Sequence, residues 1–219
     1  MSTSFPAEPP LDCDLCPRLE AYRNDNAAAH PDWFNAPVPS FGPQDARLLI
    51  VGLAPGVQGA NKTGRPFTGD YAGDLLYATL AKFGFSDGTY AARADDGLTL
   101  RDCMITNAVR CVPPQNKPTT QEARTCRPYL ETRIAELPNL KAILALGRIA
   151  HDNVVTTFKL KRSAYPFGHA AAHDLGNGVR FFDSYHCSRY NTNTRRLTEP
   201  MFHNVFALIK DHLTAAKAA

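Results

Sequence analysis

Residues 52–70 read GLAPGVQGANKTGRPFTGD and follow the apolar run RLLIV at 47–51. The run has the continuous, branched apolar composition of a buried strand, and glycines directly after such a strand let a backbone approach a ligand closely. The loop has neither the GxGxxG spacing of a dinucleotide fold nor the GK[ST] ending of a P-loop. The stretch therefore predicts a ligand-binding loop of another kind at the end of a central strand.

Strands and helices are predicted to alternate along the chain. Four runs rich in branched or aromatic residues indicate strands, at 47–52, 102–108, 141–147 and 179–185. Helical patterns and caps lie between and after them, at 70–83, 119–136, 148–158 and from Thr198 onward. This alternation favours a mostly parallel sheet covered on both faces, in a single domain over residues 1–219. Residues 1–45, rich in proline and alanine, are expected to form an irregular N-terminal arm.

Composition limits the classes of protein and partner. The 24 Lys and Arg against 21 Asp and Glu give a net charge of +3, which by itself does not indicate a nucleic-acid partner. No apolar run reaches the roughly 18 residues of a membrane span, and the start MSTSFPAEPP lacks the regions of a signal peptide. We therefore expect a cytoplasmic protein with no membrane partner, whose six cysteines are not structural disulfides.

The cysteine spacing favours a metal centre. Cys13 and Cys16 are two residues apart in a polar, proline-flanked segment, and Cys111 and Cys126 form a second pair. A two-residue gap lets both thiolates reach one metal, and four thiolates select zinc or an iron–sulfur cluster. The alternative is that Cys111 and Cys126 are buried apolar thiols. Cys103, inside a predicted strand, is expected in the core.

Three polar loops are predicted to meet at one edge of the sheet, because ligands of such sheets bind beyond the carboxyl ends of the strands. The first strand runs into the glycine-rich loop. The second ends at Asn107 and the run RCVPP at 110–114, and the fourth runs into HCSRYNTNTRR at 186–196.

These motifs, taken in order, resemble those of the uracil-DNA glycosylase superfamily. The pairing of GLAPG with TGRPFTGD is similar to family 5, the type b enzymes, and the resemblance covers nearly the whole chain. It implies an α/β fold, a three-layer α/β/α arrangement with a central four-stranded parallel sheet. It also implies a [4Fe-4S] cluster on Cys13, Cys16, Cys111 and Cys126. The motifs are CDLC at 13–16, the loop at 52–70, ITNAVRCVPPQNKPT at 105–119, Cys126, ALG at 145–147 and HCSRYNTNTRRLT at 186–198.

The resemblance implies a DNA glycosylase that hydrolyses the N-glycosidic bond of uracil, and of hypoxanthine and xanthine, in base excision repair. Such an enzyme would act as a monomer on DNA, in a prokaryotic cytoplasm and at the nucleoid. No lysine of the three loops is placed to attack the sugar, which predicts a monofunctional enzyme. The alternatives are a non-catalytic iron–sulfur nucleic-acid-binding protein of the same fold and a nucleotide-dependent transferase. The first would need a degraded Asp70 or His186, and the second a phosphate motif that the sequence lacks.

The glycine-rich loop is assigned to the flipped nucleotide that base excision requires. Its backbone amides can surround an anionic or flat ligand, and Phe67 can stack on the base. Packing of Phe67 in the core is the alternative. The loop residues assigned to substrate binding are Gly52, Leu53, Ala54, Pro55, Gly56 and Phe67.

Catalytic roles follow from the resemblance. Other families carry a carboxylate or amide where this chain has Leu53, which cannot activate water. By resemblance to family 5, Asp70 orients water or stabilises the sugar cation, a role that can coexist with capping a helix. His186 is expected to donate a hydrogen bond to the base O2 as negative charge develops. Asn116 matches a family position implicated in catalysis, whereas Asn107 matches the uracil-reading asparagine of family 4 and is assigned to base contact.

The loop after His186 is assigned to DNA docking. Ser188 and Arg189 suit phosphate contacts, and the following asparagines suit entry into the minor groove. Cys187 occupies a position where the family often has proline, which leaves the stiffness of this loop open.

Overall fold

The central sheet of the protein contains the four predicted parallel strands, each within one residue of its predicted bounds. The structure is a computed structural model that describes residues 5–176 and 178–218. The parallel strands run in the order β4-β1-β5-β7, and β6 adds an antiparallel strand beside β7 that the sequence did not predict. The strands are β1 (Leu48–Gly52), β4 (Cys103–Asn107), β5 (Ala142–Leu146), β6 (Ala172–Asp174) and β7 (Arg180–Ser184).

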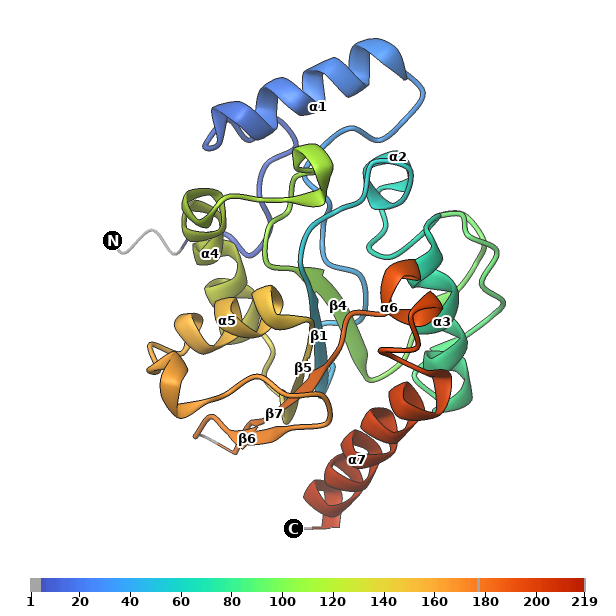
Figure 1. The fold of residues 1–219 in the computed structure, drawn as a ribbon, viewed down its shortest axis with the longest axis vertical. Helices are drawn as coiled ribbons and strands as arrows, with labels where there is room; N and C mark the ends of the chain where they lie inside the picture. Colours follow the sequence, from blue (N-terminus) through green and yellow to red (C-terminus); the bar gives the residue numbers. More distant parts are fainter. Residues whose placement is uncertain (1–4, 177, 219) are drawn as a thin grey trace.

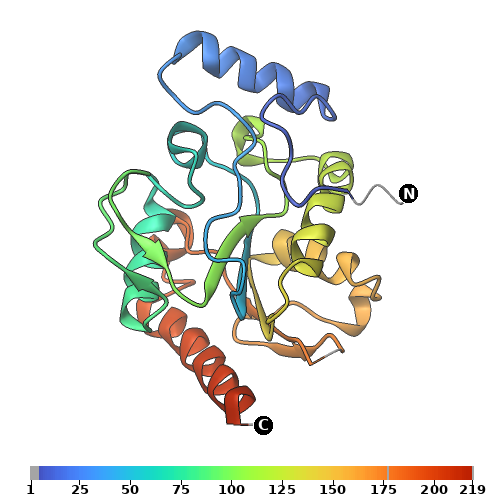
Figure 2. The ribbon, with the colours of Figure 1, turned by 180° about the vertical axis from the view of Figure 1, so that it is seen from behind.

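Helices cover both faces of this sheet, as predicted. Every residue of β1 is buried, and successive side chains point to opposite faces. Leu48 and Ile50 belong to the core under α3 and α7, whereas Leu49 and Val51 belong to the core under α4 and α5. Figures 1 and 2 show the two helix pairs on opposite sides of the sheet. The helices are α3 (Tyr71–Lys82), α4 (Thr120–Ala135), α5 (Arg148–Thr157) and α7 (Glu199–Ala218).

Side-chain caps fix where two of these helices begin. The Asp70 carboxylate accepts a hydrogen bond of 3.1 Å from the Gly73 amide at the start of α3. The predicted capping box opens α4, because Thr119 Oγ1 accepts from the Glu122 amide and the Glu122 carboxylate accepts from the Thr119 amide. The first of these caps places Asp70 at the end of the glycine-rich loop.

The N-terminal arm is more regular than expected, because it contains the helix α1 (Pro17–Ala29). Proline at the first position favours helix initiation, but α1 buries only Leu19, Arg23 and Asn26. The helix therefore lacks the apolar stripe that would reveal it in the sequence. Figure 1 shows α1 lying beyond the end of the sheet, away from both helix layers.

Ion pairs hold the arm to the rest of the protein. Glu8 accepts hydrogen bonds of 2.7 Å from both Arg110 and Arg133, whose guanidinium groups are buried. Arg18 makes two hydrogen bonds of 2.7 Å to the Glu122 carboxylate. The Glu8 carboxylate thus balances the positive charges of two buried guanidinium groups.

Several short elements lie in the connections between strands and helices. No helix within the described ranges is long and apolar enough to cross a membrane. The short elements are α2 (Ala60–Thr63), β2 (Ser86–Asp87), β3 (Thr99–Leu100), the 3₁₀ turns η1 (Pro114–Asn116) and η2 (Arg162–Ala164), and α6 (Arg189–Asn193).

Candidate functional site

The loops after β1, β4 and β7 enclose a cavity of about 470 Å³ at the carboxyl ends of the strands. The structure brings all predicted substrate-binding and catalytic residues except Gly52 to its lining. Tyr71 and five further residues line it without having been predicted. Tyr71 begins the helix that Asp70 caps, so its position beside a predicted site residue was the available signal. The unpredicted lining residues are Val57, Gln58, Gly59, Ala60, Tyr71 and Ala72.

Gly52 supports the cavity from behind, because its neighbours leave no room for a side chain. A Cβ on Gly52 would overlap Asn107 Oδ1 and come within 2.7 Å of the Phe67 ring. Phe67 has a φ of 53°, a left-handed conformation that is strained for an aromatic residue. Phe67 belongs to the hydrophobic core, as the alternative predicted, and it also lines the cavity, so stacking on a base stays a prediction.

Asn107 presents an unsatisfied amide to the cavity. It ends β4 directly opposite Gly52 and is 3% exposed. Its side-chain oxygen is buried and has no hydrogen-bond partner among the residues described. An unpaired buried amide oxygen costs free energy, so this group is available to accept a hydrogen bond from a molecule in the cavity.

The two carboxylate oxygens of Asp70 have different surroundings, one at the start of α3 and the other beside the glycine-rich loop. Oδ1 caps α3, whereas Oδ2 lies against the backbone of Gly56 and Gly59, where a Cβ on Gly59 would come within 2.5 Å of it. Burial raises the pKa of Asp70, and the amides of Gly73 and Ala72 oppose that rise by hydrogen bonding to the ionised form. The glycines thus keep one carboxylate oxygen close to the cavity.

His186 follows β7 and lies across the cavity from the glycine-rich loop. Its ring is stacked near that of Phe67, with 5.9 Å between the centroids. Burial lowers the pKa of His186 to about 4, so the imidazole is neutral near pH 7. Its backbone oxygen accepts a hydrogen bond of 2.8 Å from the Asn191 side chain. A neutral imidazole held in this way can donate one N–H to a ligand in the cavity.

Asn116, predicted to be catalytic, and the docking residues Ser188 and Arg189 also line the cavity. Asn116 is exposed at the end of η1 with a φ of 56°. Ser188 caps α6, and the Arg189 guanidinium lies 5.2 Å from the Tyr71 ring centroid. Cys187 is fully buried, and its thiol donates a hydrogen bond of 3.4 Å to the Ala72 carbonyl. The loop after His186 is therefore anchored to α3 without the proline.

The four predicted metal-binding cysteines line one small cavity between the N-terminal arm and α4. All six cysteines are free thiols, and Cys103 is in the core as predicted. Burial raises the pKa of Cys16 to about 11 and that of Cys111 to about 12, so thiolates here need a compensating cation.

Comparison with known proteins gives consistent matches. Residues 39–210 match the model of the family described as the uracil DNA glycosylase superfamily. A protein of Thermus thermophilus named type-5 uracil-DNA glycosylase is 45% identical over 196 residues, which cover 87% of this chain and 89% of that protein. Its namesake in Mycobacterium tuberculosis is 41% identical over 203 residues, 89% of this chain and 75% of that protein. A type-4 uracil-DNA glycosylase of Pyrobaculum aerophilum is 37% identical over 139 residues, 63% of this chain and 57% of that protein.

Proposed function

The chain belongs to the uracil-DNA glycosylase superfamily, and from that premise we propose that it is a monofunctional type-5 enzyme that removes uracil from DNA. The observation that carries the proposal is the unsatisfied Asn107 amide, which faces a cavity shared with Asp70 and a neutral His186. Base excision needs a group that recognises the base, one that stabilises its developing anion and one that stabilises the sugar cation. These three side chains supply one each.

Recognition begins when the target nucleotide leaves the duplex and enters the cavity. Phe67 stacks on the base, and Asn107 pairs with its amide edge, for which an asparagine offers both a donor and an acceptor. The backbone from Leu53 to Gly56 lines the cavity and can approach the nucleotide closely, since Gly56 has no side chain. Binding then satisfies the Asn107 oxygen that is otherwise without a partner.

Bond cleavage is assigned to His186 and Asp70. As the bond to the sugar lengthens, negative charge grows on the base, and the neutral His186 imidazole donates a hydrogen bond to O2. The Asp70 carboxylate stabilises the positive sugar or orients the attacking water. This role needs the ionised form, which the amides at the start of α3 favour. Asn116 contacts the nucleotide from the mouth of the cavity, and Ser188 and Arg189 contact DNA phosphates.

The same site is proposed to accept hypoxanthine and xanthine. A cavity of about 470 Å³ has room for a purine, and the lining at Leu53 and Ala54 is small and apolar. Rotation of the Asn107 amide lets it match either base edge. We further propose that the enzyme acts as a monomer on DNA, at the nucleoid of a prokaryotic cytoplasm.

A [4Fe-4S] cluster on the four cysteines completes the proposal. Their convergence on one cavity supports a shared metal centre, and the similarity to type-5 enzymes favours a cluster over a single zinc ion. The Arg110 amide lies 3.4 Å from Cys126 Sγ and donates to it, a contact that stabilises a thiolate ligand. When bound, the cluster supplies covalent links from the N-terminal arm to the loop after β4 and to the middle of α4. Its role here is structural, since none of the four cysteines lines the active-site cavity.

The proposal is tested with duplex oligonucleotides that carry uracil, hypoxanthine or xanthine at one position. Incubation with the purified protein should leave an abasic site that breaks only after alkali treatment. Tight binding without abasic sites would instead identify a non-catalytic DNA-binding protein of the same fold. Covalent trapping by borohydride would contradict the monofunctional mechanism, because it requires an amine that attacks the sugar.

A further inference from the structure

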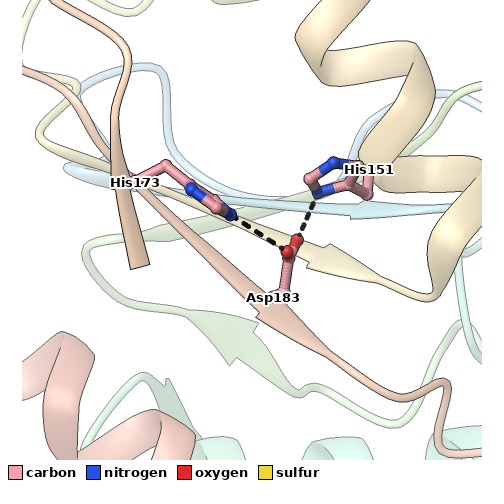
Figure 3. Close-up of side chains that lie close together, drawn as sticks. All are labelled: His151, His173 and Asp183. Carbon is pink, nitrogen blue, oxygen red and sulfur yellow. Dashed lines mark hydrogen bonds and ion pairs between the residues drawn. The ribbon is translucent and has the colours of Figure 1, made fainter. Parts of the chain in front are cut away.

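A second cluster of ionisable side chains lies outside the proposed active site and serves none of its steps. It consists of His151 in α5, His173 in β6 and Asp183 in β7, whose ligand atoms all lie within 4.8 Å of one another. Figure 3 shows both histidines pointing at the Asp183 carboxylate. The side chains of His151 and Asp183 are 1% and 0% exposed, and that of His173 is 14% exposed. A buried carboxylate with two imidazoles needs a chemical explanation.

Hydrogen bonding fixes the tautomer of His151. Its Nε2 lies 2.8 Å from the Tyr165 carbonyl oxygen, which can only accept, so Nε2 carries a hydrogen. Its Nδ1 lies 2.7 Å from Asp183 Oδ1. In the neutral ring, Nδ1 would direct a lone pair at a carboxylate oxygen. A cation must therefore lie between them, either a proton held on Nδ1 or on the carboxyl, or a metal ion.

His173 distinguishes between these two cations. Its Nε2 is buried and without a hydrogen-bond partner in the described part of the protein. The nearest charged atom, Asp183 Oδ2, is 3.5 Å away, too far for a well-formed hydrogen bond. A proton on His151 would leave His173 Nε2 unsatisfied, whereas one metal ion would satisfy both imidazoles and the carboxylate together.

We propose that His151 Nδ1, His173 Nε2 and the Asp183 carboxylate form a binding site for one divalent transition-metal ion, with zinc as the best match. Two imidazole nitrogens and a carboxylate oxygen are ligands that zinc prefers, and an open fourth position takes water. Ligands of a tetrahedral zinc ion are about 3.3 Å apart, so binding moves Asp183 Oδ1 and His151 Nδ1 apart by about half an ångström.

The surroundings of the cluster match those of a metal site. Metal-binding histidines usually donate their second N–H to a carbonyl or carboxylate, as His151 does to Tyr165. The Gly168 amide donates to Asp183 Oδ2 at 3.4 Å and holds the carboxylate in place. The ion would tie α5 and β6 to β7, the strand that leads into His186. Such a site stabilises the fold and does not depend on the glycosylase activity.

Zinc uptake by the cluster-containing protein tests the proposal. The protein is incubated with zinc chloride, passed through a desalting column and analysed for zinc, iron and sulfide. We expect one tightly bound zinc per chain in the wild type and none in His173→Gln, with equal iron in both. His203→Gln is the matched control, because it changes a histidine of α7 that contacts Lys82 of α3. This variant should keep its zinc.

A rescue variant separates metal binding from packing. His173→Cys replaces one zinc ligand with another, so it should regain zinc and, loaded with cobalt, show a thiolate charge-transfer band that the wild type lacks at this site. Zinc should also raise the melting temperature of the wild type and of His203→Gln but not of His173→Gln. Wild-type protein that retains no zinc, or equal zinc in His173→Gln, would overturn the proposal in favour of a proton on His151.

Discussion

The half-buried, neutral state of His186 makes the stability of the protein depend on pH in a defined way. The pKa of this imidazole is lowered by burial to about 4, against about 6.5 in an unfolded chain. Unfolding therefore lets His186 bind a proton more readily, so its contribution to stability is fully present above pH 6.5 and is lost as the pH falls toward 4.

The size of this effect follows from the two pKa values. Between pH 7 and pH 5 the unfolded histidine becomes almost fully protonated while the folded one stays mostly neutral. The slope rises to about 1.4 kcal/mol per pH unit only below pH 6.5, so the free energy of unfolding should fall by about 2 kcal/mol through His186 alone between pH 7 and pH 5. Asp70, His151, His169 and His203 also have shifted pKa values, so a comparison with a variant is needed.

Urea unfolding of the wild type and of His186→Gln at pH 7, 6 and 5 provides that comparison. Glutamine keeps a hydrogen-bond donor but cannot take a proton. The variant therefore lacks the pH-dependent contribution of His186 to the free energy of unfolding and retains the contributions of the other groups. The difference in unfolding free energy between the two proteins should shrink by about 2 kcal/mol from pH 7 to pH 5. Parallel pH profiles would show that His186 is not held neutral by burial, and its assignment as the neutral donor to the base would fail.

Three further predictions concern the proposed site. Asp70→Asn should slow single-turnover uracil release by ~10²-fold or more without weakening binding to uracil DNA, because asparagine preserves the helix cap but not the charge. An equal loss in binding would contradict the assignment. Arg189→Ala should lower the slope of log binding constant against log salt by about one, measured by fluorescence anisotropy, if this residue neutralises a phosphate. Gly52→Ala should destabilise the protein by about 1–3 kcal/mol in urea unfolding, since its methyl group would overlap Asn107 and Phe67. Unchanged stability would show that the two side chains can move.

The parallel strands were predictable because each is buried on both faces, which leaves a continuous apolar run such as that from Leu48 to Val51. The edge strand β6 was not, since it is three residues long and carries His173 between exposed neighbours. Helix α1 escaped prediction for a related reason, because its attachment uses ion pairs such as Arg18 with Glu122 instead of an apolar face.

The site was predictable where its residues follow strands directly. Asn107 ends β4 and His186 comes shortly after β7, so the rule that ligands bind at the carboxyl ends of parallel strands was enough to bring them together. The sequence could not show that the Asn107 oxygen lacks a partner or that Gly52 lies against Phe67, because both depend on contacts between distant segments. The pairing of His151 with Asp183 is hidden in the same way.

The Asp70 carboxylate caps a helix and also lies near the cavity, and this double role restricts which residues can replace it over evolution. One oxygen caps α3, so replacement by alanine would remove a contact worth roughly 1 kcal/mol in addition to the negative charge. Asparagine keeps the cap, and serine largely keeps it, although neither carries the charge. A descendant that abandons catalysis but still binds DNA would therefore be expected to carry asparagine or serine at this position. Asparagine or serine at this position in a homologue would then indicate selection for DNA binding without catalysis. A residue that cannot cap the helix, such as alanine, would indicate that neither property is under selection.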